Sequence, residues 1–149
     1  MVLMKRFDNH RRFARRSEAE LIVRVVRLFA HAGYQISREV PNMGQSVDIV
    51  AQTRKYVIAI EVKRSDWKRA LDQCRAHRSV ADFICIAIGT SRISSQLFET
   101  ATRLNYGVIH CPPGTTECVW ITRPKRNHRV WQPQREFFRR RILEVENGN

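Results

Sequence analysis

The chain has 149 residues, enough for one compact domain, and 43% of them are hydrophobic, which is ordinary for a protein with a packed core. The formal net charge of +13 exceeds the roughly 2–8 charges that keep a small domain soluble, so it indicates a polyanionic partner. No apolar run approaches the roughly 18 residues of a membrane span. The first residues also lack the apolar segment of a signal peptide, so we expect a cytoplasmic protein without membrane contact.

The positive charge is concentrated at the two ends of the chain. Residues 1–16 carry a net charge of +5 and residues 123–141 one of +7, whereas residues 17–122 carry only +3. We therefore expect a basic N-terminal arm over residues 1–16, a domain over residues 17–122, and a basic C-terminal arm or helix over residues 123–149. Cationic flanks of this kind favour contact with the phosphate backbone of a nucleic acid.

The cysteines and histidines show no spacing typical of a structural zinc site. Cys85 falls in an apolar run and Cys74 in a helical pattern, and no C-x-x-C pair is present. We expect all four cysteines to be free thiols in a reducing compartment, including Cys111 and Cys118.

Hydrophobic periodicity predicts an alternation of helices and strands. Ser17 with Glu20 fits a helix N-terminal capping box, Gly33 fits a helix C-terminus, and Ser65 fits the cap of a second helix. The predicted order α-β-β-β-α-β-α-β-β-α belongs to the α/β class, with a mixed sheet flanked by helices. The predicted elements are a helix over 17–32, strands over 34–40, 47–52 and 56–63, a helix over 66–79, a strand over 82–88, a helix over 94–104, strands over 106–110 and 117–122, and a helix over 134–145.

Charged residues interrupt two neighbouring apolar strands. In the segment VIAIEVK, Glu61 and Lys63 share one face of a strand, while Ile60 and Val62 face the other way. Charged side chains at the end of an apolar strand destabilise the fold unless they are paired, solvated or bound to a ligand. The short turn at residues 53–55 predicts a hairpin that brings Asp48, inside the apolar run VDIVA, within reach of the same cation as Glu61.

These residues fit metal-dependent phosphodiester hydrolysis. Mg²⁺ needs only one or two carboxylates because it keeps several waters, and Mn²⁺ is a plausible substitute. Asp48 and Glu61 would hold the ion, with the backbone carbonyl of Val62 as a further ligand. Lys63 would orient the attacking water and offset the charge that develops on phosphorus.

The pattern of Asp48, twelve intervening residues and then Glu61-Val62-Lys63, between two helices, resembles the PD-(D/E)XK nuclease superfamily. It is most similar to its restriction-endonuclease-like and archaeal Holliday-junction resolvase-like branches. The segment SEAELI is similar to the first motif of those resolvases, which implies a restriction-endonuclease-like core with Glu18 as an additional catalytic and metal-binding acid. Glu20 competes for that role, and we favour Glu18.

The helix after the motif and the basic residues supply further candidates. Gln73 and His77, four residues apart on one helix face, resemble a Q-x-x-x-Y motif of some superfamily exonucleases, with His in place of Tyr. Gln73 is therefore a catalytic candidate, although both residues could equally lie on the surface. The candidates for contact with the nucleic-acid backbone are Arg12, Arg15, Arg16, Arg64, Lys68, Arg69, Arg126 and Arg129.

Two functions remain open at this point. The first is a Mg²⁺-dependent endonuclease that hydrolyses DNA phosphodiester bonds and needs no small-molecule cofactor. Its substrate could be branched or damaged DNA. The second is a catalytically inactive nucleic-acid-binding module on a nuclease fold. Nothing in the sequence tests RNA against DNA. A junction-cleaving enzyme would need two active sites, which would make a homodimer.

Overall fold

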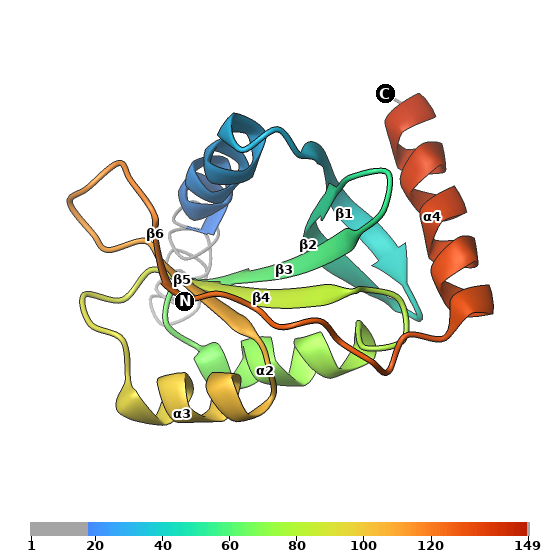
Figure 1. The fold of residues 1–149 in the computed structure, drawn as a ribbon. Coiled ribbons are helices and arrows are strands. Elements are labelled where there is room, and N and C mark those ends of the chain that lie inside the picture. Colours follow the sequence, from blue (N-terminus) through green and yellow to red (C-terminus); the bar gives the residue numbers. More distant parts are fainter. Residues whose placement is uncertain (1–17, 149) are drawn as a thin grey trace, which may run out of the picture.

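The computed structural model describes residues 18–148, so Arg12, Arg15, Arg16 and Ser17 lie outside the described residues (Figure 1). The element order agrees with the order predicted from the sequence. After the first helix, described over residues 18–31, the chain forms β1 (Gln35–Asn42), β2 (Gln45–Gln52), β3 (Val57–Lys63), α2 (Trp67–Ala76), β4 (Phe83–Ile88), α3 (Ser95–Arg103), β5 (Gly107–His110), β6 (Val119–Thr122) and α4 (Gln132–Asn147).

The six strands form one mixed sheet in the order β1-β2-β3-β4-β5-β6. Strands β3, β4 and β5 are parallel, and the other neighbours are antiparallel. The first helix covers one face, where Val25 and Phe29 pack on alternate residues of β3, and the other helices pack on the opposite face (Figure 1). Both faces of the central strands are therefore buried, which confirms the predicted sheet flanked by helices. Among the described residues, no helix is long and apolar enough to span a bilayer.

The hairpin between β1 and β2 is tighter than the sequence pattern predicts. Its turn consists of Met43 and Gly44, both with positive φ, the geometry of a two-residue type I′ turn. Asn42 pairs with Gln45 directly across this turn, so both strands extend two residues further than predicted. As a result, Asn42 lies inside the sheet and not in a loop.

Two helix starts also differ from the prediction. The cap of α2 is Asp66 and not Ser65, because the Asp66 side chain accepts a hydrogen bond from the backbone N–H of Arg69. Helix α4 begins at Gln132, two residues before the predicted start at residue 134. Pro133 is compatible with this start because proline lacks only an N–H that the first helical turn leaves unpaired.

The expectation of four free thiols is wrong for two of the cysteines. Cys111 and Cys118 form a disulfide that closes the loop between β5 and β6. Cys74 and Cys85 are free and buried, as predicted. The loop contains Pro112-Pro113-Gly114, and this turn brings the two thiols together although they are not in a recognisable C-x-x-C motif.

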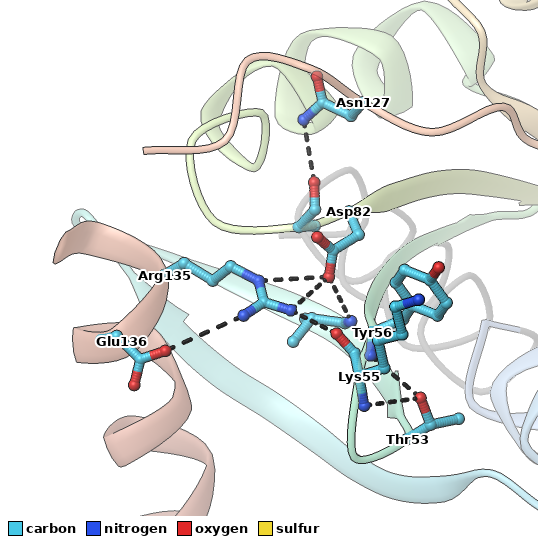
Figure 2. Close-up of polar contacts among 9 residues, drawn as sticks. Thr53, Lys55, Tyr56, Asp82, Asn127, Arg135 and Glu136 are labelled. Carbon is cyan, nitrogen blue, oxygen red and sulfur yellow. Dashed lines mark hydrogen bonds and ion pairs between the residues drawn. The ribbon is translucent and has the colours of Figure 1, made fainter. Parts of the chain in front are cut away.

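One buried carboxylate, that of Asp82, links the basic C-terminal segment to the domain (Figure 2). Oδ2 of Asp82 accepts hydrogen bonds from the backbone N–H of Val57 at 2.7 Å and from Nη2 of Arg135 at 2.8 Å. The same Nη2 also donates to the carbonyl of Lys55, and the backbone N–H of Asn127 donates to the carbonyl of Asp82. Residues near positions 55, 82, 127 and 135 are thereby tied together at the beginning of β3 and β4.

Removing this carboxylate should strongly destabilise the fold. In Asp82→Ala, the guanidinium of Arg135 and the N–H of Val57 would be buried without their partner, so we expect the free energy of unfolding to fall by about 3–5 kcal/mol. Urea unfolding followed by circular dichroism measures the change. Glu136→Gln is the matched control because the exposed Glu136 carboxylate lies 4.0 Å from the same guanidinium, and it should cost about 0–0.5 kcal/mol. Equal losses in the two variants would contradict the assigned role of Asp82.

Candidate functional site

The predicted acids meet where strands β2 and β3 separate. The last residue pair between these strands is Ile49 with Ile60, and continuing the register by one residue would place Asp48 opposite Glu61. Beyond the last pair, a side chain takes over from the backbone hydrogen bonds between the two strands. Oδ2 of Asp48 accepts a hydrogen bond from the backbone N–H of Val62 at 2.8 Å. In an extended strand the N–H and C=O of one residue point to the same edge. The carbonyl of Val62 is therefore directed toward β2, and its role as a metal ligand stays a prediction.

Glu61 is fully buried, on the face of β3 that α2 covers. Its Oε1 lies 2.6 Å from Nε2 of His77, while its Oε2 has no hydrogen-bond partner within the described part of the chain. Burial raises the pKa of Glu61 to about 9, and the nearby Asp48 carboxylate raises it further, against the opposing effect of Lys63. Without a metal, the Glu61 carboxyl is therefore protonated at neutral pH.

Lys63 lies close enough to act on this carboxyl, and Gln73 lies on the helix that carries its partner His77. Lys63 is partly exposed at the end of β3, on the same strand face as Glu61, and its charge acts on the Glu61 pKa. Gln73 lies one turn before His77 on α2, and its Oε1 is buried without a hydrogen-bond partner in the described chain. Two buried oxygens without hydrogen-bond partners among the described residues thus occur, one in Glu61 on β3 and one in Gln73 on α2.

The sequence pattern left the position of His77 open and missed Asn42. It treats His77 as a companion of Gln73 on the surface or near the site, whereas its ring is fully buried and contacts Glu61 directly. Burial lowers the pKa of His77 to about 4, so the ring is neutral at physiological pH. Asn42, assigned to a turn, contacts Nδ1 of His77 with its Nδ2 at 3.0 Å. Neither contact has a local sequence signal, since both span more than fifteen residues.

The oxygen atoms present fit Mg²⁺ better than a softer metal. Asp48, Glu61, the Val62 carbonyl and the Gln73 amide oxygen are hard ligands, and the unpartnered Oε2 of Glu61 is an acceptor that a cation would satisfy. Within residues 18–148 no three His, Cys, Asp or Glu side chains are grouped as metal ligands. Glu18 is accordingly not grouped with these two acids as a third ligand, and its assigned role stays a prediction.

The basic candidates divide between the two ends of β3. Arg64, Lys68 and Arg69 are exposed just after its C-terminal end, on the side of Lys63. The guanidinium of Arg126 lies over the ring of Tyr56, at the opposite end of the strand, and Arg129 is exposed nearby in sequence. A seven-residue strand separates these ends by about 20 Å. The C-terminal arginines are therefore not adjacent to the acids.

Comparison with known proteins supports the fold and does not extend to the activity. No family model and no curated protein matches the sequence. The solved structure of SPO1766, a protein of unknown function from Silicibacter pomeroyi, is similar to this chain with a TM-score of 0.66 and 16% sequence identity. The match covers 87% of this chain and 86% of that one, so the similarity extends over nearly the whole fold.

Proposed function

We propose that this protein is a Mg²⁺-dependent nuclease of the PD-(D/E)XK type that hydrolyses DNA phosphodiester bonds as an endonuclease. The observation that supports the proposal is the buried Glu61 carboxyl, which lies near Asp48 and has one oxygen without a hydrogen-bond partner among residues 18–148. A carboxyl in this position costs stability, because its ionised form is desolvated and repelled by its neighbour. A bound divalent cation would remove both costs.

Each residue has a defined task in this proposal. Asp48, Glu61 and the Val62 carbonyl hold the ion, and Mg²⁺ supplies Lewis-acid polarisation of the phosphate together with a more acidic bound water. Lys63, at the partly exposed end of β3, offsets the negative charge that develops on the phosphate. Gln73, whose Oε1 is buried without a partner among the described residues, would accept a hydrogen bond from a water in the site. Mn²⁺ would satisfy the same oxygen ligands.

A groove beside this strand end offers a place for the substrate backbone. It has a volume of about 560 Å³ and lies between the first helix and the loop after β5, with Arg24, Arg27 and Arg64 in its wall. Within residues 18–148, the Arg24 guanidinium donates to backbone carbonyls and to the hydroxyl of Thr115 and makes no ion pair with a carboxylate. Residues that follow the parallel strands β3 and β4, Arg64 and Gly89, also line the groove. Ligands of open sheets commonly bind at this carboxyl edge.

Replacing the groove arginines should weaken DNA binding without changing the metal site. For Arg27→Gln combined with Arg64→Gln, we expect the slope of log affinity against log salt to become less negative by about 2, one unit for each phosphate that the protein no longer neutralises. Fluorescence anisotropy of a labelled duplex between 50 and 200 mM KCl in EDTA measures this. The control is Arg140→Gln, an exposed charge on α4 across the sheet from the first helix. A slope unchanged from wild type would remove the groove from the binding surface.

A non-catalytic nucleic-acid-binding module is the competing function, and the basic surface supports it equally. Such a module would gain nothing from an acid that is buried beside another acid. The deciding experiment is incubation of the pure protein with linear, nicked, flapped and four-way DNA and with RNA, with Mg²⁺ or Mn²⁺ or with EDTA. Metal-dependent cleavage of DNA supports the nuclease, whereas metal-dependent cleavage of RNA alone would change the substrate class. Cleavage of none of them would leave the binding module.

A further inference from the structure

The side-chain amide of Asn42 has a defined orientation. Its Nδ2 lies 3.0 Å from the backbone carbonyl of Ala76 and 3.0 Å from Nδ1 of His77. A carbonyl oxygen can only accept a hydrogen bond, so the atom facing Ala76 must be the NH₂ group. The second hydrogen of that group then points to His77, across 35 positions of sequence that join the β1–β2 hairpin to the end of α2.

This orientation determines which nitrogen of His77 carries the proton. Because Nδ1 accepts from Asn42, the ring proton is on Nε2, the nitrogen that lies 2.6 Å from Oε1 of Glu61. His77 therefore donates to Glu61, and both side chains are fully buried. The ring cannot turn away without losing both hydrogen bonds, and an imidazole left buried without partners is costly.

We propose that Asn42 and His77 are positioning residues that hold Glu61 by Oε1 and leave Oε2 as its one oxygen available to a divalent cation. This inference rests on the proposed function. One open carboxylate oxygen suits the octahedral shell of Mg²⁺ or Mn²⁺, in which most ligands are waters. Ca²⁺, by contrast, commonly takes both oxygens of a carboxylate. The hydrogen bond from His77 thus disfavours the arrangement that Ca²⁺ prefers.

Two substitutions separate hydrogen bonding from packing. In His77→Gln, the side-chain amide places an N–H near the position of Nε2 and can still donate to Glu61. In His77→Leu, the volume is largely filled but the donor is absent. We expect His77→Leu to weaken Mn²⁺ binding by about 10- to 100-fold, the usual effect of losing a partner of a metal ligand. His77→Gln should remain within a few-fold of wild type.

Calorimetric titration of the full chain with Mn²⁺ and separately with Ca²⁺, without DNA, provides a readout that is independent of cleavage. The ratio of Mn²⁺ to Ca²⁺ affinity should fall in His77→Leu and be restored in His77→Gln. Equal affinity ratios in wild type and both variants would overturn the positioning role while leaving the nuclease proposal intact. Absence of any Mn²⁺ binding to the wild type would overturn both.

The ring tautomer can be measured on the unmodified protein, and His77→Gln is needed only to assign the His77 signal. Nitrogen-15 NMR of histidine-labelled protein distinguishes a protonated ring nitrogen from an unprotonated one. We expect His77 to show a protonated Nε2 and an unprotonated Nδ1 at pH 7, with assignment from the missing signal in His77→Gln. A protonated Nδ1 would overturn the inference, because Nδ1 could then not accept from Asn42.

Discussion

Asp48→Asn should abolish metal-dependent cleavage while leaving the fold in place. The substituted amide keeps an oxygen that can accept the backbone N–H of Val62, so the junction between β2 and β3 is preserved. It loses the negative charge that a divalent cation requires, and it also removes the repulsion that Asp48 exerts on Glu61. We expect the cleavage rate to fall by about 10³-fold or more, the scale of losing a group that stabilises transition-state charge.

The measurement is single-turnover cleavage of the preferred DNA substrate at saturating Mg²⁺, together with duplex binding in EDTA. Binding should be equal to or slightly stronger than that of wild type, since the net charge rises by one. Asp72→Asn makes the same change of charge at an exposed position of α2 and should cleave at the wild-type rate. Unaltered cleavage by Asp48→Asn would show that the activity belongs to other residues.

Glu61→Gln should stabilise the metal-free protein and inactivate it at the same time. The folded-state pKa of Glu61 is about 9 and its ordinary value is 4.5, so the folded state binds a proton that the unfolded state releases between these values. The stability contributed by this group is therefore complete below pH 4.5 and is lost as the pH rises toward 9. A glutamine has no proton to lose and can still accept from His77 through its Oε1.

The expected gain of Glu61→Gln over wild type is near zero at pH 4.5 and about 3 kcal/mol at pH 7, from 1.36 kcal/mol per pKa unit. Urea unfolding in EDTA at several pH values measures it. The lowered pKa of His77 makes the free energy of unfolding rise with pH, the opposite of the Glu61 effect. Because His77 is present in both proteins, it contributes little to the difference in stability between them. A pH-independent difference between the two proteins would show that Glu61 is ionised in the folded state. Loss of cleavage in this stabilised variant would support the use of the carboxylate in catalysis.

The sequence alone was sufficient to predict the order of the elements. Period-two and period-3.6 patterns report which faces of a segment are buried, and the predicted order of helices and strands agrees with the structure. The turn between β2 and β3 also brings Asp48 and Glu61 together as predicted, because a short antiparallel hairpin leaves one register for its strands. These properties depend on residues close in the chain.

Only the tertiary structure decided how the acids are surrounded. The pairing of His77 with Glu61, the amide of Asn42 on His77 and the ion pair of Arg135 with Asp82 join segments that are 16 to 53 residues apart. Such contacts depend on how α2 and α4 cross the sheet, and no local pattern encodes that crossing. The burial that raises the pKa of Glu61 arises in the same way, since a strand pattern shows which face a residue occupies but not which helix covers that face.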